Sequence, residues 1–106
     1  MSGKSGTGLT EELLAWDGVT TSPHRFGGVE FQWNGKEIGH LHDDRLFDIL
    51  LPKPDRDRRI EQGKAKPHHI FPDSGWVSVY LNDEQDVANA IEIARAKYDQ
   101  MILRGM

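Results

Sequence analysis

Apolar and polar residues alternate along the stretch that begins at Val29. Val29, Phe31 and Trp33 are separated by Glu30 and Gln32, the period of two that is typical of a half-buried β-strand. Asn34-Gly35 follows at once, and this dipeptide is the strongest short hairpin signal because both residues tolerate positive φ. The pattern therefore predicts a β-hairpin over residues 29–42.

The loop length of this hairpin predicts which residues face each other. If Asn34 and Gly35 alone form the loop, Phe31 faces Ile38, Val29 faces His40 and Gly27 faces His42. Directly opposed residues share one face of a sheet. We therefore expect His40 and His42 on the same face as the apolar residues Val29, Phe31 and Ile38, at the border of the core, with Leu41 on the other face.

The rest of the chain alternates between helical and strand patterns. It predicts a short helix from Thr10 to Trp16, a strand over 46–51 ended by Pro52, a helix over 55–62 ended by Gly63, a strand over 76–81 and a long final helix capped by Asn82 and Gln85. At 106 residues the chain has room for one core. We expect a single α+β domain over residues 9–106, with an antiparallel sheet of about four strands and helices packed on one face. Residues 1–8, rich in Gly and Ser, are expected to form a flexible tail.

Composition excludes several classes of protein. There is no cysteine, which rules out disulfides, thiolate metal sites and a cysteine nucleophile. No apolar run is long enough for a membrane span or a signal peptide, so we expect a cytoplasmic protein without membrane contact.

The chain is acidic as a whole, but one segment is basic. A net charge of −4 argues against a protein that coats nucleic acid. The segment 53–66 is locally basic, which indicates either a solvated helix face or a phosphate-binding ridge. The candidate residues of such a nucleic-acid-binding ridge are Lys53, Arg56, Arg58, Arg59, Lys64 and Lys66.

The histidines are the candidates for chemistry. All five lie between residues 24 and 69, and a pair at i and i+2 on a strand, such as His40 and His42, can bind a divalent metal together with a carboxylate such as Asp44. Hydrogen-bonded structural histidines are the favoured alternative, and no cofactor is predicted. An enzyme is disfavoured because no residue lies in a nucleophile motif. Trp33 and Trp76 are expected in the core rather than on a stacking surface.

Several motifs resemble a known family. The segments GVEF, EIGHLH, PHH and PDSGWVS are similar to those of the luciferase domain-containing family of small, mostly bacterial proteins. A looser similarity to the MmcQ/YjbR-like proteins, with their strand pair, W-V-x-V strand and late tyrosine, implies a related α+β fold and DNA binding. The luciferase-domain motifs draw attention to a set of polar residues as ligand-binding candidates: His24, Arg25, Glu30, His40, His42, His68, His69 and Asp73.

The sequence thus supports three functional hypotheses. The leading one is a small binding module, without enzymatic activity, that receives an anionic small ligand or a protein partner at its histidine-bearing loops. The second is a nucleic-acid-binding protein that uses the basic segment, and the third is a metal-dependent hydrolase that uses the histidines. Light production by flavin chemistry is not expected, since such monooxygenases are built on much larger barrels.

Overall fold

The computed structural model describes residues 5–23 and 27–105, and it contains one antiparallel sheet and three helices. The sheet has six strands in the order β1-β2-β3-β4-β6-β5. The strands are β1 (Val19–Pro23), β2 (Val29–Trp33), β3 (Lys36–His42), β4 (Leu46–Leu50), β5 (Lys66–Pro67) and β6 (Trp76–Tyr80), and the helices are α1 (Ser5–Leu14), α2 (Lys53–Glu61) and α3 (Glu84–Gly105). The predicted α+β class is confirmed, but the sheet has six strands rather than about four.

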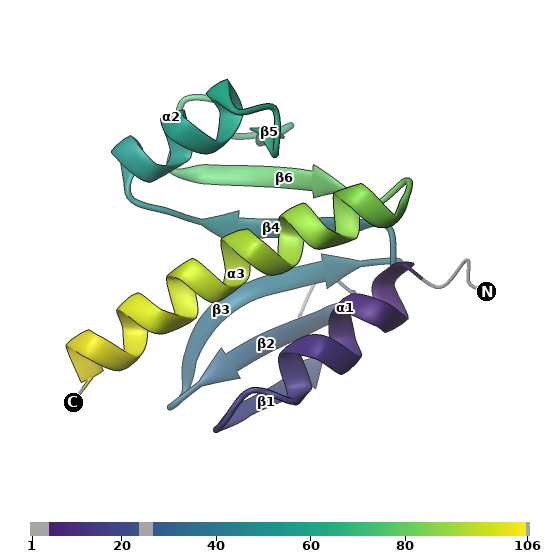
Figure 1. The fold of residues 1–106 in the computed structure, drawn as a ribbon, viewed down its shortest axis with the longest axis vertical. Helices are drawn as coiled ribbons and strands as arrows, with labels where there is room; N and C mark the ends of the chain where they lie inside the picture. Colours follow the sequence, from purple (N-terminus) through teal and green to yellow (C-terminus); the bar gives the residue numbers. More distant parts are fainter. Residues whose placement is uncertain (1–4, 24–26, 106) are drawn as a thin grey trace.

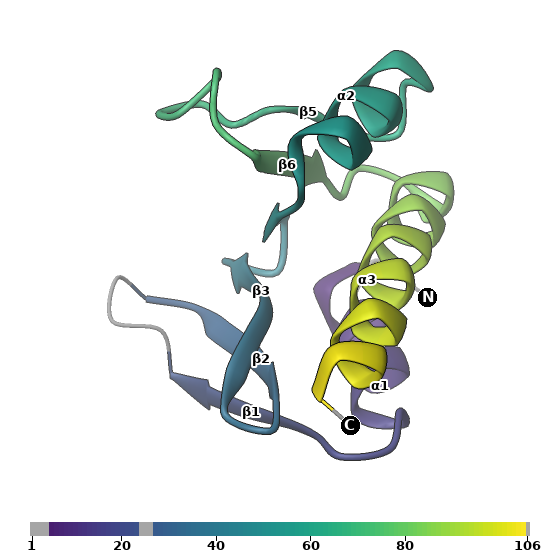
Figure 2. The same ribbon diagram turned by 90° about the vertical axis from the view of Figure 1, so that its left-hand side faces the viewer.

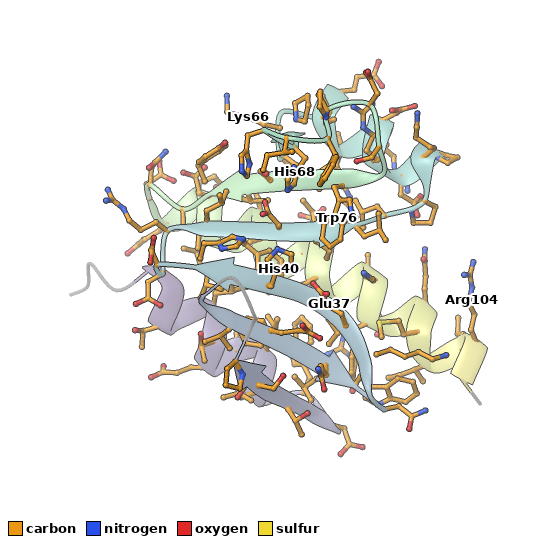
Figure 3. The ribbon with its side chains drawn as sticks, turned by 180° about the vertical axis from the view of Figure 1, so that it is seen from behind. Glu37, His40, Lys66, His68, Trp76 and Arg104 are labelled. Atoms are coloured by element: carbon orange, nitrogen blue, oxygen red, sulfur yellow. The ribbon has the colours of Figure 1, made fainter. Side chains whose placement is uncertain are left out.

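The helices divide the sheet into a covered face and an open face. Helices α1 and α3 pack on one face, and α2 lies beside the edge formed by β5 and β6 (Figures 1 and 2). Fully buried side chains such as Phe31, Phe47, Ile49 and Val77 fill the space under α1 and α3. The opposite face, seen in Figure 3, carries no helix over β3 and β4. Polar side chains can therefore gather on this open face, although Asp48, Ser78 and His40 there are buried.

The two strands missing from the prediction are both at the edges of the sheet. Strand β1 pairs with β2 and has largely exposed side chains, and β5 contributes only two residues next to β6. An edge strand with polar side chains shows little apolar alternation. This is why the pattern of apolar residues did not reveal them.

The register of the hairpin differs from the predicted one. Asn34 and Gly35 form the turn at positive φ as expected. However, Gln32 pairs with Glu37 while Phe31 pairs with Gly39, so Ile38 is an extra residue in β3. This β-bulge shifts every later pair by one residue. His40 consequently opposes Glu30 rather than Val29, and Leu41 opposes Val29. The expectation that His40 and His42 share the apolar face was wrong, and both lie on the open face.

The first and last helices, α1 and α3, begin at different residues from those predicted. Helix α1 begins at Ser5, so residues 5–8 of the predicted tail are helical, while residues 1–4 lie outside the described residues. Its stability comes from Leu9 and Leu13, which are fully buried, rather than from intrinsic helix propensity. At α3 the cap is Asp83, whose Oδ1 accepts a hydrogen bond from the Asp86 amide, rather than Asn82. No described helix is long and apolar enough to span a membrane.

Strands β3 and β4 separate after a short paired stretch. They are joined only from His40 to His42 and from Leu46 to Asp48. Beyond Asp48, β4 continues beside β6 alone, and the first half of β3 pairs only with β2. Helix α3 crosses the sheet diagonally over this divergence (Figure 1). We refer to the region beyond this divergence, between the end of β4, the start of α2 and the last turns of α3, as the sheet opening.

Candidate metal centre

The paired part of β3 and β4 brings two histidines and one aspartate together on the open face. A short turn after His42, in which Asp43 and Asp44 have positive φ, reverses the chain. His42 then opposes Leu46 and His40 opposes Asp48. Because opposed residues share a face, the side chains of His40 and Asp48 point to the same side. His42 lies two residues further along β3 and joins them there.

Asp48 is the centre of this group. Its side chain is 1% exposed, and its Oδ1 accepts a hydrogen bond of 2.6 Å from the Ser78 hydroxyl on β6. Three imidazole Nε2 atoms surround the other oxygen, Oδ2, at 3.6 Å (His40), 3.3 Å (His42) and 3.4 Å (His68). Among the described residues no hydrogen bond reaches Oδ2. The ligand atoms of His40, His42 and Asp48 lie within 4.8 Å of one another, close enough together to hold a metal ion.

The protonation of Asp48 follows from these neighbours. Burial raises the pKa of its carboxyl group, but the imidazole of His40 and the hydroxyl of Ser78 outweigh burial and lower the pKa below its usual value. Asp48 is therefore ionised at neutral pH. A buried negative charge requires compensation from protonated imidazoles or from a bound cation.

His40 is held between two carboxylates. Its Nδ1 lies 2.6 Å from Glu37 Oε2, and its Nε2 faces Asp48. Burial lowers the pKa of His40, but Asp48 and Glu37 together outweigh burial and raise the pKa to about 9. In the metal-free protein His40 is thus an imidazolium that donates from Nδ1 to Glu37. The Glu37 contact also fixes the ring so that Nε2 faces the centre.

His68 has the opposite protonation pattern. Its Nδ1 accepts hydrogen bonds from the amides of Ile70 (3.1 Å) and Phe71 (3.2 Å). An accepting nitrogen carries no proton, so the neutral ring holds its proton on Nε2. Burial lowers the pKa of His68 and thereby favours this neutral form. His68 therefore directs an N–H toward Asp48 and has no lone pair to offer a metal from Nε2.

Aromatic side chains form one wall of the group. The Trp76 ring lies 5.3 Å from the ring of His40 and 6.0 Å from that of His68. Figure 3 shows Trp76, His40 and His68 close together on the open face, with Glu37 next to His40. The prediction that Trp76 belongs to the core was wrong, because bonding of β6 to β4 turns Trp76 and Ser78 toward the histidines.

The other predicted ligand-binding residues lie around the group or outside it. Glu30 opposes His40 across the hairpin, and its Oε2 accepts a hydrogen bond from Gln32. His69 is exposed and stacks on His68 with ring centres 4.5 Å apart. Asp73 and Asp44 are exposed, and neither belongs to a group of described side chains that could hold a metal. His24 and Arg25 lie outside the described residues.

The basic segment is engaged in ion pairs with neighbouring acids. Arg58 contacts Asp55 at 2.6 Å, and Arg59 and Lys64 both contact Glu92 on α3, at 2.6 and 2.8 Å. Arg56 contacts Asp57 and donates to the Pro72 carbonyl. Lys53 and Lys66 are exposed and lie apart, at the start of α2 and on β5. Compensated charges of this kind are typical of a solvated helix face, and nucleic-acid binding stays a prediction.

Sequence reasoning missed Asp48, although a signal was present. Asp48 stands alone in the apolar run LFDILL, where a carboxylate is costly unless it has partners. A hairpin turn at 43–45 would also have placed it opposite His40. The nearby Asp43 and Asp44 drew attention because they follow the histidines directly. Their positive φ places them in the turn instead.

Comparison with known proteins identifies one family. A family model described as Luciferase domain matches residues 35–97, more than half of the chain, which confirms the predicted resemblance. The matched range includes His40, His42, Asp48 and His68. Neither the curated proteins nor the solved structures include a significant match. No comparison shows the similarity to MmcQ/YjbR-like proteins.

Proposed function

The chain belongs to the luciferase domain family, and we propose that it is a metal-dependent domain whose ion is bound by His40, His42 and Asp48. The observation that carries the proposal is the buried Asp48 Oδ2, which accepts no hydrogen bond from the described residues and lies 3.3 to 3.6 Å from the Nε2 atoms of three histidines. Two imidazoles and one carboxylate form a ligand set used by catalytic zinc and by non-haem iron. The ion would be a divalent transition metal.

The distances between the three ligand atoms support an ion at their centre. Asp48 Oδ2 lies 3.6 Å from His40 Nε2 and 3.3 Å from His42 Nε2. Ligands about 2.1 Å from a metal lie about 3.0 Å apart in an octahedral site and about 3.4 Å apart in a tetrahedral one. The two distances to Asp48 Oδ2 therefore agree with the tetrahedral spacing within about 0.2 Å, and all three ligand atoms lie within 4.8 Å of one another.

Outer contacts support the same ligand set. Glu37 binds Nδ1 of His40, which is the carboxylate partner that metal-bound histidines usually have, and Ser78 binds the non-ligating oxygen of Asp48. A second group of metal-ligating residues consists of Asp48, His68 and His69. It fits less well because His68 uses Nδ1 to accept two amide hydrogen bonds. We assign His68 the role of orienting Asp48.

Three protein ligands leave open coordination positions for a small molecule. His42 is the most exposed of the three ligands and gives the group its contact with solvent, and Trp76 supplies a flat apolar wall beside His40. A metal with free positions acts as a Lewis acid toward an oxygen of a bound molecule. We therefore still propose an anionic small ligand, but we expect it to bind at the metal rather than at an arginine or a loop.

Metal titration of purified, chelator-treated protein tests the proposal. We expect one Co²⁺ or Zn²⁺ per chain, measured by calorimetry and, for Co²⁺, by visible absorption. Asp48→Asn and His42→Ala each remove a ligand and should weaken binding more than the roughly 10–100-fold typical of outer-shell changes. Fe²⁺ is titrated under nitrogen in the same way.

Two further variants serve as controls. Asp44→Asn removes an exposed carboxylate in the adjacent turn and should leave the affinity unchanged. His69→Ala distinguishes the two groups of potential ligands, since only the group with His68 uses it. Absence of binding for all three ions, or binding that survives Asp48→Asn, contradicts the proposal. If His69→Ala lost binding and His42→Ala kept it, the metal site would be the group of Asp48, His68 and His69.

A further inference from the structure

A second feature, the pocket at the sheet opening, is separate from the metal ligands. It has a volume of about 400 Å³ and lies between the end of β4, the start of α2 and the last turns of α3. Its wall is largely apolar and includes Leu50, Leu51, Pro52 and Met101. Small-molecule sites commonly have this size and are mostly apolar with a few polar groups that fix orientation.

The charged residues that line this pocket are all cationic. They are Lys53 at the start of α2 and Lys97 and Arg104 on α3, and the remaining lining residues include no carboxylate. Two acids in the neighbourhood of Lys97 have other partners: Asp55 pairs with Arg58, and Glu37 contacts His40. An anion that enters the pocket therefore meets positive charge without meeting a competing acid on the wall.

Lys97 is the most buried of these three cations and has no close anionic partner among the described residues. Across residues 5–23 and 27–105 it makes no hydrogen bond or close ion pair. Burial lowers the pKa of its ammonium, and the charge of Glu37 opposes this effect only in part. A partly buried lysine with no partner costs stability. A ligand with a negative charge would supply Lys97 with the close partner that the described residues do not give it.

We propose that the sheet opening binds an amphipathic carboxylate, with its carboxylate at Lys97 and its hydrocarbon part against Leu50, Leu51 and Met101. The two halves of this ligand match the two halves of the wall. A purely polar anion such as phosphate would leave the apolar wall hydrated, and a neutral hydrocarbon would leave Lys97 unpaired. The site does not require the metal, although Glu37 lies between Lys97 and His40 and connects the two regions electrostatically.

Octanoate is the probe for this site, used below its micelle concentration with metal-free, chelator-treated protein. Chemical shifts of backbone amides should change at Leu50, Gly75 and Met101, and 1-octanol and inorganic phosphate should each bind at least about tenfold more weakly, which corresponds to about 1.4 kcal/mol. Because metal is absent, a negative result here leaves the metal proposal intact, and a failed metal titration leaves this one intact.

Three variants make the test specific. Lys97→Met keeps the length of the side chain and removes its charge, and it should weaken octanoate binding to the level of octanol. Met101→Trp fills the pocket and should abolish binding of both octanoate and 1-octanol. Lys36→Met removes an exposed charge at the β2–β3 turn, outside the pocket, and should have no effect. Equal binding of octanoate by Lys97→Met and by the unaltered protein, or shift changes confined to residues away from the pocket, overturns the inference.

Discussion

At the scale of single residues, Asp48 organises the open face. Its carboxylate is 1% exposed, accepts a hydrogen bond from Ser78 and compensates the imidazolium of His40. Sequence patterns identified His40, His42 and His68 as candidates, but paired them with acids nearby in sequence. Partners in a sheet are set by strand register, and register depended on a turn and a bulge that residue types alone do not specify.

Removal of the Asp48 charge should destabilise the metal-free protein. In Asp48→Asn the Ser78 hydroxyl keeps an acceptor, but the buried His40 imidazolium loses one of its two carboxylates. Breaking a buried ion pair from one side costs roughly 3–5 kcal/mol, and we expect the free energy of unfolding to fall by about 3 kcal/mol at pH 7. Urea unfolding measures the change. A loss below about 0.5 kcal/mol, the scale of a surface substitution, would show that Asp48 does not compensate His40.

Glu37 should affect the metal through His40. In Glu37→Gln the amide can still contact Nδ1, but the negative charge that increases the basicity of the ring is gone. We expect the dissociation constant for Zn²⁺ to rise about 10–100-fold, with the stoichiometry unchanged. Competition calorimetry with a chelator measures both. Unchanged affinity would mean that His40 is not a ligand.

At the scale of elements, local patterns predicted the central structure and failed at its edges. The Asn-Gly turn, the strand over 76–81 and the long final helix follow from residue types that act locally, and all are present. Strands β1 and β5 exist because neighbouring strands offer hydrogen bonds, and α1 extends to Ser5 because Leu9 and Leu13 are buried against the sheet and α3. Such tertiary causes leave little trace in the apolar pattern.

The substitution Gly8→Ala tests whether α1 includes residue 8. Gly8 lies inside the helix, is exposed, and a Cβ at this position would meet no heavy atom within 4 Å. Alanine is better than glycine in a helix, so Gly8→Ala should stabilise the protein by about 0.5–1 kcal/mol. Thermal unfolding followed by circular dichroism measures this gain. A flexible segment at residues 1–8 would give no comparable gain.

At a second glycine, Gly28, we expect alanine to destabilise the protein. Gly28 has φ +85°, and a Cβ there would lie 2.1 Å from the Leu41 carbonyl oxygen. Gly28→Ala should therefore destabilise the protein by more than about 1 kcal/mol, since both strain and a backbone clash oppose it. If both alanines stabilised the protein, the cause would be an effect on the unfolded chain. The gain from Gly8→Ala would then no longer show that residue 8 is helical.

At the scale of the whole molecule, α1 and α3 cover one face of the sheet, and the sheet opening lies where α3 passes the end of β4 and the start of α2. The separation of β3 from β4 gives α3 access to the opening, where Lys97 carries a charge that burial disfavours. The sequence predicted helices on one face, but not the opening, because the end of strand pairing follows from the twist and bulge of the assembled sheet.

Lys97 should make stability depend on pH in a defined direction. Its folded pKa lies below that of the unfolded chain, so the unfolded state binds more protons and stability rises as pH increases through the folded pKa. Lys97→Met removes this cost. The variant should melt at a higher temperature than the unaltered protein at pH 7, and the difference should shrink toward pH 10.5. A difference that is absent at pH 7, or that grows with pH, would show that the ammonium is not disfavoured by burial.

Anomalous diffraction would show whether His40, His42 and Asp48 hold a metal ion. Crystals of zinc-loaded protein are measured on both sides of the zinc absorption edge, which locates the ion independently of its ligands. We expect one strong peak about 2.1 Å from His40 Nε2, His42 Nε2 and Asp48 Oδ2, with His68 still accepting the amides of Ile70 and Phe71. A peak only at exposed groups such as His69 or Asp73, with Asp48 Oδ2 still surrounded by imidazoles alone, would contradict the account.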